Sequence, residues 1–241
     1  MFKTLCITGL MAIAVSAHAH QIWLEQPAGK SAVIRFGEFG ENLREASPGL
    51  LDKFVKPTAT LVSTAGEKNV DGSKTASGFA LPFAARQGES IVAEEASYPL
   101  RKFKQGDKEV TSWYHPGARL VTGFAAQQPK LTLDLVPAGQ PGEFKLFFKG
   151  QPLSKAKVAL VTQSGWAKEG HTDEQGLVKF DMPWKGQYVA EVSHIDRTPG
   201  ERPGANGPEQ YDMVSYVTTL TYVKAGGVAP IPAGPVAAPN K

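Results

Sequence analysis

Short runs in which apolar and polar residues alternate recur along most of this chain, and glycines and prolines lie between them. The clearest run, residues 131–135, is apolar at every second position, as expected for a strand with one buried face. Because strands have this period of two and amphipathic helices a period near 3.6, the pattern predicts an all-β protein. The expected strands lie at residues 20–24, 32–36, 59–63, 79–83, 90–94, 131–135, 144–148, 156–162, 177–181, 186–194 and 214–223.

Two segments do not fit the alternating pattern. Residues 37–54 predict a long irregular loop, in which Ser47 could cap a short helix with Pro48 at its first position. Residues 97–122 combine a solvated charged stretch with bulky aromatic residues and a turn, and they predict no definite element.

The densest turn cluster of the folded part, residues 137–142, marks a predicted domain boundary. We therefore expect an N-terminal β domain at residues 20–136 and a C-terminal β-sandwich domain at residues 137–223. From residue 224 to residue 241 alanine, glycine and proline dominate, and such a segment buries no core. It predicts a disordered tail.

The first nineteen residues follow the pattern of a secretory signal peptide. Lys3 precedes an apolar run that is too short for a membrane span, and Ala17-His18-Ala19 is a small-x-small cleavage site. We expect export to the periplasm and a mature chain that begins at His20. Its free amine and imidazole would form a nitrogen chelate for a transition metal. Cleavage after Ala17 would instead expose His18-Ala19-His20, an amino-terminal copper- and nickel-binding arrangement, and the histidines could equally serve the peptidase alone.

Composition limits the chemistry that the mature chain can use. Cys6 is the only cysteine, and it would leave with the signal peptide, so disulfides, thiolate metal sites and a cysteine nucleophile are excluded. The net charge is only +3 and no run of like charge occurs, which argues against nucleic-acid or anionic-membrane binding. Any metal ion must be held by His, carboxylate, Met or backbone groups.

His194 lies at the predicted end of the strand 186–194, on the same face as Tyr188, and Asp196 would share that face. A His-x-Asp pair at a strand end can supply two metal ligands, or one ligand and its orienting carboxylate. The simpler interpretation is a histidine at the edge of the core, bonded to a backbone carbonyl. Glu38 and Glu41 flank Gly40 in the long loop and could complete a mixed histidine and carboxylate site, although solvated loop carboxylates are common.

Other candidates have structural explanations. His171 adjoins a turn and is expected to be exposed, and His115 lies among aromatic residues that could line a cleft or simply pack. Trp166 and Trp184 at predicted corners could bind sugar rings if exposed. The chain contains no nucleophile elbow, zinc-protease helix motif, phosphate-binding glycine loop or dinucleotide fingerprint, so we expect a binding protein and not an enzyme.

Two sets of residues resemble a known family. The set His20, Trp23, Leu24 and Glu25 near the start, with Thr172, Asp173, Gly176 and His194 downstream, resembles an uncharacterised family of exported β proteins, the DUF4198 type. Its members are often labelled periplasmic components of cobalt or nickel uptake. The turns and strands of the second half also resemble carboxypeptidase-regulatory and transthyretin-like sandwiches, with an immunoglobulin-like topology. The resemblance supports His20 and His194 as ligands and gives little support to His171 or His115.

The sequence therefore predicts an exported periplasmic protein that binds a divalent nickel, cobalt or copper ion through His20, His194 and Asp196. Its partners would be the ion and a membrane transporter, with no nucleic acid and no membrane span in the mature chain. The alternative is a metal-free adhesion or carbohydrate-binding sandwich with Trp113, Trp166 or Trp184 exposed. A third possibility, a copper monooxygenase, needs a second histidine beside His20.

Overall fold

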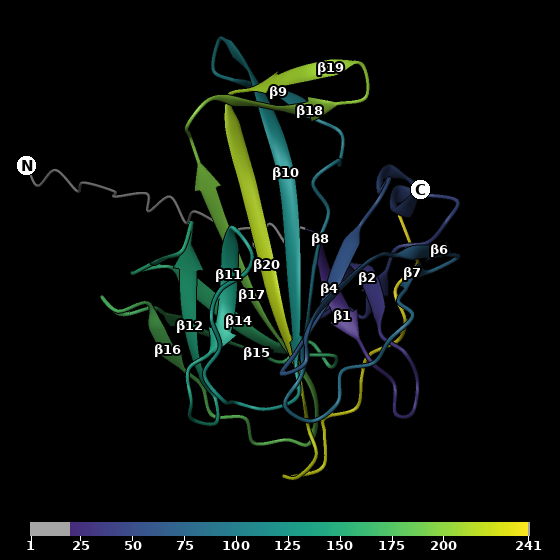
Figure 1. Ribbon diagram of the computed structural model, residues 1–241, viewed down its shortest axis with the longest axis vertical. Coiled ribbons are helices and arrows are strands. Elements are labelled where there is room, and N and C mark those ends of the chain that lie inside the picture. The colour runs from purple at the N-terminus through teal and green to yellow at the C-terminus, as the bar shows by residue number, and fades with distance from the viewer. Residues whose placement is uncertain (1–19, 241) are drawn as a thin grey trace, which may run out of the picture.

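The structure is a computed structural model that describes residues 20–240, and its all-β architecture confirms the predicted fold class. A tall central sheet runs through the molecule, and one smaller sheet lies to each side of it (Figure 1). Within the described residues the one helical element is a short 3-10 helix, η1 (Leu50–Lys53). It begins after Gly49, and the Ser47 hydroxyl donates to Asp52. The predicted signal peptide lies outside the described residues.

The central sheet has the order β15-β14-β17-β20-β10-β8-β4-β5, and β9 pairs with the far end of β10. Its strands are β4 (Thr58–Ser63), β5 (Gly66–Asp71), β8 (Ser90–Glu94), β9 (Arg101–Gln105), β10 (Lys108–Val121), β14 (Lys157–Thr162), β15 (Ala167–His171), β17 (Gly186–Asp196) and β20 (Met213–Lys224).

β10 and β20 form the long parallel pair at the centre of Figure 1. Their register extends from Ser112 opposite Met213 to Val121 opposite Tyr222. β20 also pairs along its length with β17, in antiparallel orientation. A strand from the end of the chain therefore joins the strands of both predicted domains into one sheet. The boundary at residue 137 stays a prediction, because a continuous sheet does not show whether the two segments fold separately.

The two smaller sheets cover opposite faces of the central sheet. The first contains β1 (Gln21–Glu25), β2 (Val33–Glu38), β3 (Leu43–Arg44), β6 (Ser73–Thr75) and β7 (Gly78–Ala80). The second contains β11 (Leu133–Pro137), β12 (Glu143–Phe148), β13 (Gln151–Pro152) and β16 (Leu177–Lys179). On β20 the Thr219 hydroxyl donates to the Ile22 carbonyl of β1, whereas its neighbour Leu220 packs in the core that contains Leu133. Successive side chains of a strand point to opposite faces, so each face has its own core.

A buried ion pair connects the second small sheet to β10 of the central sheet. Arg119 of β10 donates from Nε to Asp134 of β11 over 3.0 Å, and both side chains are almost fully inaccessible to solvent. Asp134 also accepts backbone N–H groups from Lys130 and Leu131. These additional donors offset part of the cost of removing the carboxylate from water.

The chain after β20, for which the composition predicts a disordered tail, contacts the rest of the molecule in the structure, and its disorder stays a prediction. Residues 225–240 run extended along the molecule, and in Figure 1 this yellow segment ends near η1. The Val228 backbone pairs with the segment at Trp184, and Ala237 forms a bridge with Leu43. The Asn42 side chain donates to the Gly234 carbonyl over 2.9 Å. Each of these three contacts uses a backbone group of the segment, which a segment with few large apolar side chains can still make.

Candidate functional site

His20 lies immediately before β1, and its imidazole is held between two carboxylates. Nδ1 is 3.2 Å from Oε1 of Glu38, and Nε2 is 2.6 Å from Oε1 of Glu45. Glu45 is completely buried, Glu38 keeps 17% of its side chain exposed, and the imidazole is about one quarter exposed. An imidazole with both ring nitrogens on carboxylate oxygens requires an extra proton, on the ring or on one carboxyl.

The hairpin of β1 and β2 places Glu38 beside His20. Gln21 is the partner of Gly37 in the antiparallel register, so His20 and Glu38 are the next positions on their respective strands. Alternation puts Glu38 on the face of Phe36, whose ring centroid is 5.2 Å from that of His20. Glu45 follows β3, and its backbone N–H donates to the Phe36 carbonyl over 2.8 Å. Both carboxylates are thus set by strands of the first sheet.

Aromatic side chains form the inner wall of the site. Phe36, Phe54, Tyr98 and Tyr114 contact one another in sequence, with ring centroids 4.4 to 5.1 Å apart for three of the pairs. The Tyr114 hydroxyl donates to the His20 carbonyl over 2.6 Å, and burial raises the pKa of this phenol far above its ordinary value. Tyr114 therefore stays a neutral donor and attaches the start of β1 to the central sheet.

A third carboxylate lies close by. Glu191 of β17 accepts a hydrogen bond from the Gln21 side chain. Burial raises the pKa of Glu191 to about 7; the hydrogen bond from Gln21 opposes this shift, and the charge of Glu38 adds to it. Within residues 20–240, no lysine or arginine forms an ion pair with Glu38, Glu45 or Glu191. The surroundings of His20 therefore carry more acidic than basic groups.

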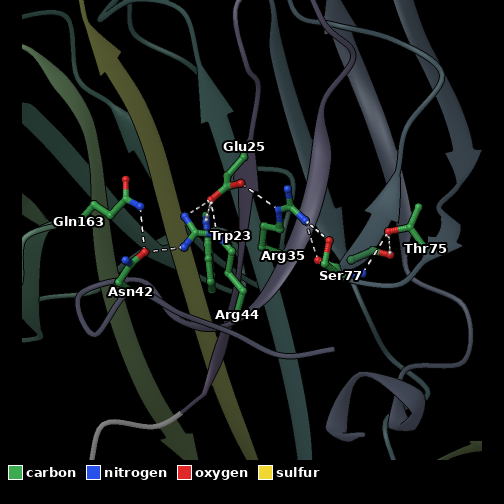
Figure 2. Close-up of polar contacts among 9 residues, drawn as sticks. Trp23, Glu25, Arg35, Asn42, Arg44, Thr75, Ser77 and Gln163 are labelled. Carbon is green, nitrogen blue, oxygen red and sulfur yellow. Dashed lines mark hydrogen bonds and ion pairs between the residues drawn. The ribbon is translucent and has the colours of Figure 1, made fainter. Parts of the chain in front are cut away.

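A polar network at the other end of β1 fixes this strand against its neighbours (Figure 2). Glu25 accepts from Arg35 over 2.8 Å, from Arg44 over 2.6 Å and from the indole of Trp23 over 3.1 Å. Arg44 also donates to Asn42, which accepts a further bond from Gln163 beyond β14. The burial of Glu25 raises its pKa, but the two arginines outweigh this and hold it below the ordinary value.

The structure does not bring His194 and Asp196 to His20. Glu191 faces β1, so alternation along β17 places His194 and Asp196 on the opposite face of the central sheet. There His194 packs on Phe148, with ring centroids 4.5 Å apart. Hydrogen bonds from Lys149 and Thr198 lower the pKa of Asp196 to about 2, so this carboxylate is already paired. One ion cannot take both histidines as ligands in this arrangement.

The remaining candidates either pack against neighbouring side chains or are exposed. His115 stacks on Trp113 and contacts Glu94 over 3.1 Å, and His171 is exposed at the end of β15. Trp166 and Trp184 are half-buried and pack edge to face, with centroids 4.6 Å apart, and Trp113 is half-buried too. None of the three tryptophans is fully exposed, and the carbohydrate-binding alternative stays a prediction. The contacts of His20 include no second histidine, as a copper monooxygenase site would require.

Among residues 20–240, no group of three or more His, Cys, Asp or Glu has the arrangement of a ready metal site. None of the helical structure in that part of the chain is long and apolar enough to cross a membrane. Together, the fold and the His20 site define an all-β sandwich protein with a histidine–carboxylate cluster at the start of its first strand.

The sequence profile of one family, described as Domain of unknown function (DUF4198), matches residues 17–196, and the chain belongs to this family. The match spans His20, both flanking carboxylates and Glu191. A comparison with curated proteins gave no significant match.

Sequence reasoning found His20 and Glu38 but missed Glu45, Glu191 and Asn240. The hairpin register could have indicated Glu38 more firmly. Nothing in the local pattern around Glu45 or Asn240 connects them to His20.

Proposed function

We propose that this protein is an exported, non-enzymatic binder of a divalent nickel, cobalt or copper ion, and that it passes the ion to a membrane transporter. The observation that carries the proposal is the imidazole of His20 between Glu38 and the buried Glu45. Nitrogen and carboxylate donors suit these ions, and the mature chain is expected to have no thiolate. The resemblance to families labelled cobalt or nickel uptake supports the transport role.

The two ring nitrogens would have different tasks. Nε2 donates to buried Glu45, which orients the ring as a carboxylate commonly orients a metal-binding histidine. Nδ1 faces Glu38 and is also the nitrogen that forms a chelate with the amine of an N-terminal histidine. When two donor atoms each lie about 2.1 Å from an ion, the donor–ion–donor angle determines the distance between them. For angles between those of square and tetrahedral coordination, that distance is about 3.0 to 3.4 Å. The 3.2 Å between Nδ1 and Oε1 of Glu38 falls within that range.

The ion would take the place of the proton between Nδ1 and Glu38, together with the α-amine that signal cleavage would expose. Neutral imidazole and amine are the ligating forms, so binding releases protons and weakens as the pH falls. Glu38 supplies negative charge that a cation would compensate.

Isothermal titration of the chain beginning at His20 with Ni²⁺, Co²⁺ and Cu²⁺ tests the proposal. We expect His20→Ala to abolish binding and Glu38→Gln to weaken it at least tenfold. A chain that retains Ala19 should also bind less tightly, because its free amine is displaced by one residue. Matched controls are Glu41→Gln, a neighbouring exposed carboxylate, and His194→Ala. The proposal fails if the unmodified chain binds none of the ions, or if His20→Ala binds them equally well.

A further inference from the structure

The last part of the chain closes over the His20 site. Residues 234–240, here called the strap, leave the region of Trp184 and follow β3. The Ala237 N–H donates to the Asn42 carbonyl over 3.3 Å, and Asn240 reaches Glu45. The strap contributes no strand to any sheet, and most of its side chains are exposed.

Asn240 makes specific contacts with the carboxylate behind His20. Its backbone N–H donates to Oε2 of Glu45 over 3.0 Å, and its side-chain Nδ2 donates to Oε1 over 2.7 Å. The same Nδ2 lies 3.1 Å from Nε2 of His20. Both carboxylate oxygens are therefore occupied, and the orientation of the carboxyl group is fixed. Gly49 permits this approach, because a Cβ at that position would lie 3.2 Å from the Asn240 carbonyl oxygen.

The burial of Glu45 makes these donors important. An ionised carboxylate away from water is stable only when it is paired and hydrogen-bonded. The hydrogen-bond donors to the Glu45 side chain, within the part of the chain described, come from His20 and Asn240. Without Asn240, the carboxylate would keep the imidazole as its donor and would be free to rotate or to admit water.

We propose that Asn240 is a positioning residue for the His20 site, and that the strap holds the imidazole in the orientation that directs Nδ1 toward Glu38 and solvent. The inference rests on the proposed metal function. Fixing Glu45 fixes which ring nitrogen carries the proton, because Nε2–H must donate to Glu45. Nδ1 is then the nitrogen left to bind an ion.

The composition of the strap suits this role. Pro235 and Pro239 restrict the undocked segment to extended conformations, so less entropy is lost when it docks. Few apolar contacts hold it, and it should open by local fluctuation without unfolding of the sheets. The strap can therefore leave Glu45 and dock again while the sheets stay folded.

The test uses the full mature chain and two substitutions at one exposed position. Asn240→Ala removes the side-chain donor, and Asn240→Asp replaces it with a carboxylate of the same shape that repels Glu45. Asn206→Ala, in the exposed turn between β18 (Gly200–Gly204) and β19 (Gly207–Tyr211), is the matched control. The first measurement is the NMR spectrum of the His20 imidazole and the exchange rate of the Asn240 amide without metal. The second is Ni²⁺ affinity and dissociation rate.

In the unmodified chain we expect the Asn240 amide to be protected from exchange. In both Asn240 variants we expect the His20 resonances to differ from those of the unmodified chain, with the larger change for aspartate. Ni²⁺ affinity should fall about tenfold in Asn240→Ala and further in Asn240→Asp, with faster dissociation, while the control is unchanged. Unaltered resonances together with an unprotected amide overturn the positioning role. Equal Ni²⁺ affinity and dissociation rates in the unmodified chain and both variants also overturn it, and leave the metal function standing. Altered resonances in a chain that binds no ion support the positioning and overturn the metal function.

Discussion

The carboxylates of Glu25 and Glu45 are stabilised by different kinds of partner. This difference distinguishes a structural contact from a candidate binding site. Glu25 accepts hydrogen bonds from two arginines and an indole, which stabilise its charge strongly. Glu45 is more deeply buried but is paired with an imidazole and an amide. An arginine keeps its proton at any ordinary pH, whereas an imidazole can exchange it for a metal ion. The first arrangement suits a permanent structural contact, and the second suits a binding site.

The arginines around Glu25 make the stability of the protein depend on pH. Their charges hold the pKa of Glu25 below its ordinary value of 4.5. Because the folded pKa is the lower one, the stabilisation is fully present above pH 4.5 and is lost as the pH falls through the folded value. Glu25→Gln should therefore be less stable than the unmodified chain at pH 7, and the difference should shrink at pH 3. Urea unfolding at both pH values measures this, and a constant difference would contradict it.

Strand β20 is the element on which the architecture depends, because it contacts both small sheets and joins both halves of the central sheet. It carries three completely buried threonines, Thr218, Thr219 and Thr221. The hydroxyl of Thr219 donates to the Ile22 carbonyl over 2.8 Å. The hydroxyls of Thr218 and Thr221 have no hydrogen-bond partner among residues 20–240. One strand thus carries a buried threonine whose hydroxyl is hydrogen-bonded and two whose hydroxyls are not.

This difference gives a matched pair of substitutions. Thr219→Val removes the donor to the Ile22 carbonyl and should lower the free energy of unfolding by about 1 to 3 kcal/mol. Thr221→Val removes a buried hydroxyl without a partner, and it should leave stability unchanged or raise it by up to about 1 kcal/mol. Chemical denaturation of both variants checks the sign. Equal losses at the two positions would mean that the Thr221 hydroxyl has a partner, such as an ordered water.

Most of the predicted strands have a buried face, but β10 lies in the segment 97–122 for which no definite element is predicted, although its residues 116–121 are buried. Residues 90–94, for example, have the bounds expected from their apolar run, and β17 and β20 extend the expected strands by one or two residues at their ends. β5, β15, β18 and β19 were not predicted, because their charged or glycine-rich sequences lie at sheet edges and in an outer hairpin. Their strand structure comes from backbone pairing with a neighbour, which alternation does not encode.

The residues of the His20 site also show that local sequence patterns do not encode tertiary contacts. His20 could be identified from the cleavage pattern, and Glu38 from its loop. Glu45 and Asn240 reach His20 only through the return of β3 and the path of the strap, which are tertiary features. His194 has the right residue type at a strand end, but whether it faces His20 depends on which sheet covers each face of β17.

For the molecule as a whole, the shared central sheet predicts one cooperative unfolding transition. The long register of β10 with β20, together with the pairing of β20 with β17, makes the central sheet continuous across both predicted domains. Differential scanning calorimetry of the mature chain should give a calorimetric enthalpy equal to the van't Hoff enthalpy. Two resolved transitions would instead support independent domains divided near residue 137.

The position of β20 at residues 213–224 also determines when the protein can fold. The strands β8 and β9, which pair with β10 on one side, precede it in the chain. Its parallel partner β20 is synthesised about a hundred residues later, and pairing over such a separation is intrinsically slow. A growing chain therefore remains without its central strand until nearly all of it has been made. The signal peptide predicted at residues 1–19 would act during this interval, on a chain that has not yet folded and can still be threaded through a membrane. Delayed completion of the sheet would thus keep the protein competent for export.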